Sequence, residues 1–278
     1  MLMNIAAYIH PERLLVCIWE MDESVPMIHA YKELDPSTDV NFTELGYAQT
    51  DVIVHSSDVR LHWFPVGSGA DLQEQHVFEG AAWFADQGYT ALPGATCATI
   101  IQTPIPMHAS LQARDSVLFR CSQLAPNAAV SVDIDLDIQA ALHCTQPRMS
   151  PWLIIGRRGA AWQATLISSD HTPLASSVFT HDFDYSNEAM LSLIHRAMQD
   201  RHGVTIDAIM VYGDNVTADQ ISSLRQTWLG NGVRIARSQP FARIGSLLDA
   251  EAEQRLLRRS HVVAPLAGIM LRRAAVQA

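Results

Sequence analysis

The order of predicted secondary structure constrains this chain more than any single motif does, because the same order occurs twice. In each half, three strand-like runs joined by short turns precede a helix, a strand, a helix and a final strand. The opening runs lie at 4–8, 13–20 and 25–31 in the first half, and at 152–156, 161–168 and 174–179 in the second. A three-strand meander followed by alternating elements predicts an α/β fold of two similar lobes, with mixed sheets flanked by helices.

The two halves continue with the same kinds of element. In the first half the sequence predicts a strand pair at 51–55 and 60–64, a helix at 70–87, a strand at 98–102, a helix at 109–124 and a strand at 129–135 leading into 138–143. In the second half it predicts a helix at 187–201, a strand at 206–212, a helix at 217–229, a strand at 233–236, and helices at 247–259 and 264–271. Apolar spacing of three and four residues favours the helices, and β-branched runs favour the strands.

The charged residues also divide the chain near its middle. The formal net charge is −10, but residues 1–150 hold 6 basic and 18 acidic side chains, whereas residues 151–278 hold 13 basic and 11 acidic ones. The change coincides with the polar, proline-containing stretch 145–151, which is typical of a boundary. We therefore expect lobe I at 1–148 and lobe II at 149–278. An acidic lobe beside an arginine-bearing lobe could favour contact between the two lobes or a head-to-tail association, as in a homodimer.

Composition excludes several classes of protein. Hydrophobic residues make up 48% of the chain and charged residues 17%, which is not the composition of a disordered chain. The acidic first half argues against a nucleic-acid-binding surface, because phosphates require clustered cations. No apolar run reaches the ~20 residues of a spanning helix and no secretory signal is visible, so we expect a cytoplasmic protein. The cysteines at 17, 97, 121 and 144 are far apart, which predicts buried thiols rather than a zinc site.

Four stretches resemble one branch of the actin-like proteins. They are VSVDIDLDIQAAL at 130–142, PWLIIGRRGAAWQATL at 151–166, IDAIMVYGDN at 206–215 and APLAGIML at 264–271. They are similar to segments of PilM, the bacterial actin-like protein of type IV pilus assembly, and of the cytoplasmic part of GspL in type II secretion. The resemblance covers most of 130–271, and before that it rests on element order alone. It implies an actin-like (ribonuclease H-like) fold, duplicated in two lobes.

The resemblance also implies where a nucleotide would bind, and there the sequence departs from the family's pattern. Actin-like ATPases hold ATP phosphates between two glycine turns, whose backbone amides bind the phosphates and whose acids orient Mg2+ or water. Here the turn at 8–12 has no glycine and contains Pro11, which lacks an amide proton. The turn at 155–159 has no acid. The remaining candidates for a remnant nucleotide cleft are Gly156, Arg157, Gly159, Gly213, Asp214 and Asn215.

These departures predict a degenerate ATPase that is not an enzyme and has no ATP or Mg2+ as cofactor. We expect a non-catalytic scaffold of a pilus or secretion-type assembly. Its partner would be a protein, such as the cytoplasmic segment of a membrane assembly protein, bound in a groove or at a sheet edge. Through that partner the chain would reach the inner-membrane face. The alternatives are an ATP-binding or sugar-kinase-like enzyme with atypical phosphate loops, and an actin-like protein outside pilus biology.

Two charged motifs allow a functional and a simpler interpretation. Asp133, Asp135 and Asp137 alternate, so on a predicted strand they share one face and could hold Ca2+ or Mg2+. A solvated strand face is the favoured interpretation. Arg157 and Arg158 lie at a glycine turn and could bind a phosphate or an acidic peptide, but an exposed hairpin tip is favoured.

Histidine-containing and arginine-containing stretches are interpreted in the same way. Residues 55–58 (HSSD) and 181–184 (HDFD) each combine histidine with acidic or hydroxyl side chains. A turn is the favoured interpretation of the first stretch and a helix N-cap that of the second. Arginines near the C-terminus could meet an acidic lobe or anionic lipids, or could be solvated helix cations. They lie at positions 255, 258, 259, 272 and 273.

Overall fold

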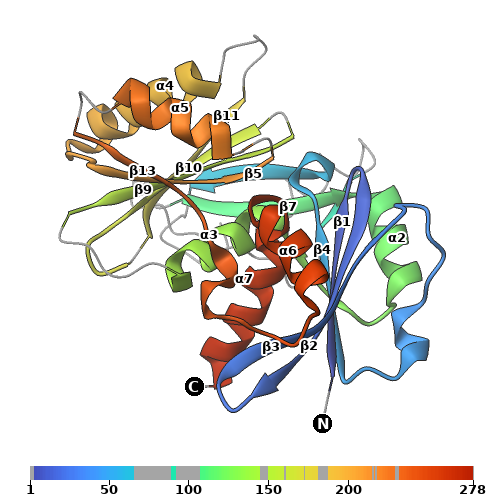
Figure 1. Ribbon diagram of the computed structural model, residues 1–278. Coiled ribbons are helices and arrows are strands. Elements are labelled where there is room, and N and C mark those ends of the chain that lie inside the picture. The colour runs from blue at the N-terminus through green and yellow to red at the C-terminus, as the bar shows by residue number, and fades with distance from the viewer. Residues whose placement is uncertain are drawn as a thin grey trace.

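In the computed structural model of the chain, the described residues are 3–65, 89–91, 107–144, 150–159, 161–171, 173–180, 187–214, 216, 218–228 and 232–277. They form two large mixed sheets, a small third sheet, and helices packed against the large sheets (Figure 1). The predicted helix at 70–87, the predicted strand at 98–102 and the motif at 181–184 lie outside the described residues.

The first large sheet has six strands in the order β14-β3-β2-β1-β4-β8. Their bounds are β1 (Asn4–His10), β2 (Arg13–Asp22), β3 (Val25–Leu34), β4 (Gln49–Val54), β8 (Ala129–Val132) and β14 (Gly245–Ser246). The first three strands form the predicted antiparallel meander, because two-residue turns join them. β4 pairs parallel with β1, and β8 pairs parallel with β4. Parallel pairing requires long crossover connections, and the chain provides these between β1 and β8.

The second large sheet has five strands in the order β11-β10-β9-β12-β13. Their bounds are β9 (Trp152–Arg158), β10 (Ala161–Ile167), β11 (Pro173–Thr180), β12 (Ala208–Gly213) and β13 (Arg234–Arg237). An antiparallel meander again comes first, and β12 and β13 again extend the sheet in parallel from its first strand. The two sheets therefore share one strand order, which confirms the predicted duplication of a mixed α/β unit.

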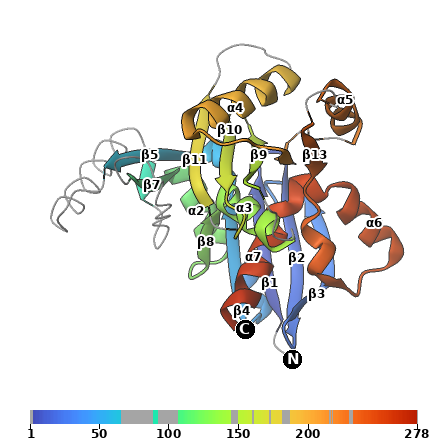
Figure 2. The same cartoon turned by 90° about the vertical axis from the view of Figure 1, so that its left-hand side faces the viewer.

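Helices cover the second sheet on both faces (Figure 2). The helices among the described residues are α2 (Asp115–Leu124), α3 (Asp133–Cys144), α4 (Asn187–His202), α5 (Ala218–Trp228), α6 (Ala250–Arg258) and α7 (Ser260–Gln277). α4 and α5 pack Ile194 and Leu224 against Leu153 and Ile209 on one face. α3 packs Ala141 and its neighbours against the opposite face. Each face of this sheet is thereby removed from water.

The first sheet is also covered on both faces, and one of its layers comes from the far end of the chain. α7 packs Leu266 and Met270 against Ala6 and Tyr8 of β1, and Leu136 of α3 joins the same core. α2 covers the opposite face. In Figure 1, α3 and α7 run through the middle of the molecule, between the two sheets. These two helices form a layer that contacts both sheets.

Two predictions about the first half are wrong. β4 and the next strand, β5 (Val59–Pro65), do not pair, because the 3₁₀ turn η2 (Ser56–Asp58) carries the chain into a separate sheet. That sheet pairs β5 with β7 (Met107–Arg114), and β7 with β6 (Tyr89–Ala91). The predicted helix at 109–124 is a strand as far as Arg114 and a helix only from Asp115. The part up to Arg114 is a strand because it pairs with β5, and pairing with a neighbouring strand outweighs the local preference for a helix.

The prediction that 129–135 is one strand is also wrong. β8 ends at Val132, and α3 begins at Asp133. Acidic side chains favour the first turn of a helix because they face its positive end, and Ala140 and Ala141 continue the helix well. Asp133 and Asp137 are therefore four residues apart on one helix face, instead of alternating along a strand. Neither is solvated: their exposed fractions are 0% and 1%.

The C-terminal segment returns to the first sheet. β14 pairs with β3, and α6 and α7 pack on the core of that sheet. The sheet of the first half is thus completed by residues from the second half. The boundary predicted between 148 and 149 falls next to residues outside the described part, and it stays a prediction. α6 starts at Ala250, where Asp249 caps it, and α7 is longer than the predicted 264–271.

Several C-terminal arginines bind acidic or polar groups of the first half of the chain. Arg259 pairs with Glu33, and Arg273 lies 2.6 Å from Asp51, which is fully buried. These cations therefore serve contacts within one chain, and the homodimer stays a prediction. Among the described cysteines, those at 17 and 121 are buried and the one at 144 is half-buried, all as free thiols. None of the described helices is long and apolar enough to cross a bilayer.

The two central helices approach so closely that a glycine is required between them. A Cβ atom on Gly268 of α7 would lie 2.1 Å from the backbone oxygen of Leu136 of α3. We expect Gly268→Ala to lower the free energy of unfolding by about 1–3 kcal/mol, although alanine favours helices more than glycine does. Urea unfolding measures this change. Ala275→Leu, on the exposed part of the same helix, is the control and should change stability by less than about 0.5 kcal/mol. Equal effects of the two substitutions would contradict the close approach.

Candidate functional site

Polar side chains gather where the central parallel strands of both sheets end. His10 ends β1, His55 follows β4, and Asp133 follows β8 in the first sheet. Arg158 ends β9, and Asp214 follows β12, in the second sheet. The carboxyl ends of parallel strands are where α/β sheets place their binding sites. Since these ends face each other across the two sheets, five residues distant in sequence form one cluster.

Arg158 is the centre of this cluster. Its side chain is only 2% exposed. Nε and one terminal nitrogen bind the carboxylate of Asp137 in a bidentate pair, at 2.9 and 2.8 Å. The other terminal nitrogen binds Asp214 at 3.1 Å and the carbonyl of Val262, also at 3.1 Å. The fifth bond runs to the carbonyl of His261 at 3.3 Å. All five N–H groups of the guanidinium therefore have partners in the protein.

A proline explains why α7 offers a carbonyl to Arg158. Pro265 lies inside α7 and has no N–H, so the carbonyl of His261, four residues earlier, lacks its normal helical partner. Arg158 supplies the missing donor. A buried carbonyl without a donor would be costly, so the proline and the arginine depend on each other. The start of α7 is thereby tied to the end of β9.

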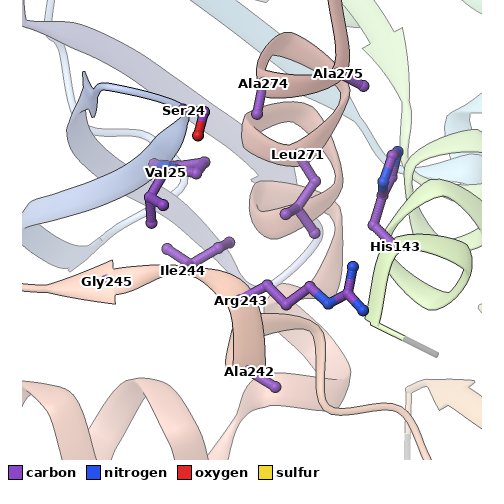
Figure 3. A pocket seen from close by; sticks show the side chains of 11 residues that line it. Ser24, Val25, His143, Ala242, Arg243, Ile244, Gly245, Leu271, Ala274 and Ala275 are labelled. Atoms are coloured by element: carbon purple, nitrogen blue, oxygen red, sulfur yellow. The ribbon is translucent and has the colours of Figure 1, made fainter. Parts of the chain in front are cut away.

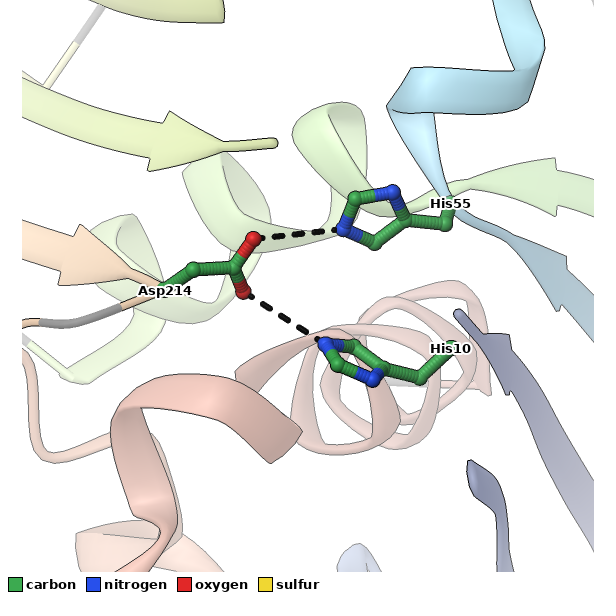
Figure 4. Close-up of side chains that lie close together, drawn as sticks. All are labelled: His10, His55 and Asp214. Carbon is green, nitrogen blue, oxygen red and sulfur yellow. Dashed lines mark hydrogen bonds and ion pairs between the residues drawn. The ribbon is translucent and has the colours of Figure 1, made fainter. Parts of the chain in front are cut away.

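The carboxylate of Asp214 receives groups from both sheets. Figure 4 shows it between the rings of His10 and His55, whose Nε2 atoms lie 3.6 and 3.3 Å from its two oxygens. From its own lobe it accepts Arg158 and the backbone N–H of Gly159, the latter at 2.9 Å. Burial opposes the charged form, but the two histidines, Arg158 and Gly159 together hold the pKa of Asp214 far below its usual range. Asp214 is therefore ionised at neutral pH.

Backbone contacts orient both histidine rings. Nδ1 of His10 accepts a hydrogen bond from the N–H of Glu12 at 3.2 Å, and Nδ1 of His55 accepts one from Ser57 at 3.1 Å. An accepting Nδ1 leaves the ring proton on Nε2, which faces Asp214. Both turns of the first sheet thus direct a donor at one carboxylate of the second sheet.

Asp133 and Asp137 are two further acids of the cluster, and both lie beside Arg158. Asp133 accepts hydrogen bonds from the hydroxyl of Tyr8 at 2.8 Å and from the N–H of Ser56 at 3.1 Å. Burial, with the charges of Asp133 and Asp214 as further causes, raises the pKa of Asp137 to about 7 in spite of Arg158 beside it. For Arg158, burial acts against the charge, but the neighbouring acids raise its pKa well above normal. In the described part of the chain, three acids therefore lie around Arg158, and burial keeps one of them, Asp137, partly protonated near neutral pH.

The structure places the remaining cleft candidates around this cluster. Gly156 lies against the ring of Tyr212, which a Cβ atom would meet at 1.9 Å. Gly213 has φ +96°, and a Cβ there would lie 2.1 Å from the oxygen of Arg157. The Arg157 guanidinium donates to the carbonyl of Gly159 and lies over the ring of Trp162. The side chains of Asp135 and Asn215 lie outside the described part.

Sequence reasoning missed the most connected members of this cluster. Arg158 is buried, so the favoured interpretation of an exposed hairpin tip is wrong for it. His55 is 1% exposed and belongs to the cluster, although its local turn at 55–58 was correctly expected. His10 was not singled out beyond its turn. A usable signal exists in hindsight: a polar residue stands at or just after the end of each central strand.

One group of the described residues has the composition of a metal site. The nitrogen atoms of His10 and His55 and the carboxylate of Asp214 lie within 4.8 Å of one another. Imidazole and carboxylate are ligands that suit divalent transition metals. The alternative of a metal-binding strand face formed by Asp133, Asp135 and Asp137 is wrong, because this segment is helical and Asp137 binds Arg158.

A second feature lies at the other end of α7. A groove of about 650 Å³ lies between the β2–β3 turn, the end of α3, the 3₁₀ turn η4 (Pro240–Arg243) and α7 (Figure 3). Val25, Ile244 and Leu271 give it apolar walls, and Arg243 and His143 are its basic groups. None of its described lining residues carries a carboxylate. Burial, and to a lesser degree the charge of Arg243, lowers the pKa of His143.

Comparisons with known proteins identify the fold. No protein-family model matches the sequence, and no curated protein matches it significantly. The structure is similar to that of the PilM–PilN type IV pilus biogenesis complex, with a TM-score of 0.59 and 12% identity over 96% of this chain and 98% of that chain. It is similar to a Bacteroides thetaiotaomicron protein of actin-like ATPase fold and unknown function, with a TM-score of 0.58 and 11% identity over 92% and 95%.

A further similarity is weaker. The cytoplasmic domain of EpsL, an inner-membrane component of the type II secretion system of Vibrio cholerae, matches with a TM-score of 0.43 and 10% identity over 99% of this chain and 95% of that chain. The two stronger matches cover nearly the whole length of both partners. The chain therefore has the actin-like fold that its sequence predicts, in a two-lobe α/β arrangement.

The arginine of the cluster should be essential for stability. Arg158→Leu leaves Asp137 buried without its bidentate partner, so we expect the free energy of unfolding to fall by about 3–5 kcal/mol in urea titrations. Arg157→Leu, at the neighbouring half-buried position, should cost about 1 kcal/mol. Adding Asp137→Leu to Arg158→Leu should restore much of the loss, because no unpaired acid then remains at that position. Similar losses for Arg157→Leu and Arg158→Leu would contradict the central role of Arg158.

Proposed function

We propose that this protein is a non-catalytic scaffold of actin-like fold that binds a segment of a partner protein. The observation that carries the proposal is that the turns of the cleft already bind the chain's own carboxylate. The N–H of Gly159 and the guanidinium of Arg158 are both directed at Asp214. Donors that would serve phosphate oxygens in an actin-like ATPase are thus used inside the protein.

The other cleft features support the same proposal. The turn after β1 contains Pro11, which offers no N–H, and the N–H of Glu12 is bound by His10. The space beside Gly156 is taken by the ring of Tyr212. Admitting a triphosphate would require breaking contacts of Asp214 that are charge-assisted and mostly buried. The energetic cost of that change favours a protein that does not use ATP.

Partner binding is best supported at the groove at the C-terminal end of α7. Its apolar walls suit the side chains of an extended or helical segment, and Arg243 is exposed at its edge. A carboxylate on that segment would pair with Arg243, since none of the described lining residues is acidic. A protein segment with apolar anchors and an acidic residue is therefore the proposed occupant.

The proposed setting is a pilus or secretion-type assembly. A solved protein of the same fold forms a complex named PilM–PilN, in type IV pilus biogenesis. By analogy, we propose a cytoplasmic location, with the inner-membrane face reached through a partner rather than through the chain itself. The rival hypothesis is an ATP-binding enzyme with atypical phosphate loops, and an ATP-binding measurement separates the two.

The scaffold hypothesis predicts no stabilisation by nucleotide. Millimolar ATP with Mg2+ should leave the melting temperature unchanged in a thermal-shift assay. If ATP bound with a Kd one hundredth of its concentration in the assay, the free energy of unfolding would instead rise by about 2.7 kcal/mol. Inorganic tripolyphosphate with Mg2+ at equal concentration is the control for general salt effects. A shift that occurs with ATP and not with tripolyphosphate would refute the non-nucleotide part of the proposal.

The groove predicts a position-dependent crosslink to the partner. A photoreactive phenylalanine derivative in place of Ala275 should crosslink one specific protein in the source cells, and Arg243→Glu should strongly reduce the yield by reversing the charge at the groove. The same derivative in place of Ser222, exposed on α5, is the control and should not capture that protein. Equal crosslinking from both positions, or no effect of Arg243→Glu, would contradict binding in this groove.

A further inference from the structure

The contact between the two sheets has a geometry that hydrogen bonds explain only in part. Nε2 of His10 lies 3.6 Å from one oxygen of Asp214, and Nε2 of His55 lies 3.3 Å from the other. Charge-assisted hydrogen bonds between such groups are about 2.7–2.9 Å long. The 3.6 Å contact exceeds any ordinary hydrogen bond, although all three residues are held in place by other contacts.

These separations suit ligands around one metal ion. Zinc binds histidine nitrogen at about 2.0–2.1 Å and carboxylate oxygen at about 2.0–2.2 Å, in a tetrahedral arrangement. Two ligands of such a tetrahedron are about 3.4 Å apart. The 3.3 Å and 3.6 Å contacts end on different oxygens of Asp214, and whichever oxygen binds the ion, its distance to one imidazole nitrogen is close to that value. One ligand atom from each of the three residues lies within 4.8 Å of the other two. Figure 4 shows the rings and the carboxylate converging from opposite sides.

Charge balance around these residues also favours a cation. Among the described residues, the carboxylates of Asp133, Asp137 and Asp214 all lie within 4 Å of the guanidinium of Arg158. Asp133, Asp137 and Arg158 are each at most 2% exposed. A divalent cation bound to Asp214 would offset part of the negative charge of this group of acids.

The surroundings can also accept the proton change that metal binding requires. A metal-bound Nε2 places the ring proton on Nδ1, where an acceptor is needed. The hydroxyl oxygen of Ser57 lies 2.7 Å from Nδ1 of His55 and can take this role. The backbone N–H groups that now contact the Nδ1 atoms belong to Glu12 and Ser57. Both are exposed turn residues, so water can replace these contacts.

We propose that His10, His55 and Asp214 bind one divalent cation of the zinc class, which joins the two lobes. Two imidazoles and one carboxylate favour zinc or cobalt over magnesium, which prefers oxygen ligands. The fourth position is left for water, as in zinc sites with three protein ligands. The ion would connect the ends of β1 and β4 in one sheet to the end of β12 in the other, so its binding would stabilise the observed arrangement of the two sheets.

Calorimetry on metal-free protein tests the proposal. Titration with ZnCl2 should show one equivalent bound and a higher melting temperature, whereas MgCl2 should have no effect. His10→Ala and Asp214→Asn should each weaken zinc binding by at least about 100-fold. The control is His29→Ala, which removes another histidine beside a carboxylate, that of Glu20 at 2.7 Å. It should bind zinc like the wild type.

Cobalt gives a readout that does not depend on the variants folding. Wild-type protein with one equivalent of Co2+ should show the visible absorption of a tetrahedral nitrogen–oxygen site, and Zn2+ should displace it. A thiolate-to-cobalt charge-transfer band would instead assign the metal to a cysteine and overturn the proposal. Folded wild-type protein that binds no Zn2+, or equal zinc affinity in His10→Ala, Asp214→Asn and His29→Ala, would overturn it as well.

Discussion

The structure depends on the buried guanidinium of Arg158, which joins elements that no local interaction would bring together. Its five donors reach α3 through Asp137, the end of β12 through Asp214, and the start of α7 through two backbone carbonyls. A buried arginine is tolerable only when every donor is satisfied, so these partners must be positioned together. Pro265 adds to the dependence, because it leaves free the carbonyl that Arg158 takes.

This single interaction accounts for the relation between the two duplicated sheets. The parallel strands of each sheet end on the side that faces the other sheet, and α3 and α7 lie between the two sheets (Figure 1). In an ATPase of this fold, a nucleotide and its metal would link the lobes at that place. Here Arg158, Asp214 and two histidines provide the link from within the chain. The proposed zinc-class ion would strengthen the same connection without requiring a nucleotide.

The sequence predicted the fold well where local periodicity and long-range pairing agree. Both three-strand meanders, the strand at 206–212 and the helix at 187–201 were correctly expected. The predictions failed where partners distant in sequence decide the structure. Residues 107–114 have a helix-like pattern but pair with β5, and Asp133–Asp137 alternate like a strand but begin a helix. The actin-like fold followed from element order, which does not depend on these local errors.

For the candidate site, the sequence shows directly that the turn at 8–12 has no glycine and that the turn at 155–159 has no acid. It could not reveal what takes their place. Adjacent arginines look alike in a sequence, yet Arg158 is buried among acids while Arg157 is half-buried beside Trp162. Strand alternation sends neighbours to opposite faces, and only the packing of the second sheet against α3 and α7 decides which face is the interior. The sequence therefore determined the duplicated α/β plan, and the tertiary structure alone decided that a buried charge cluster joins the strand ends of its two sheets.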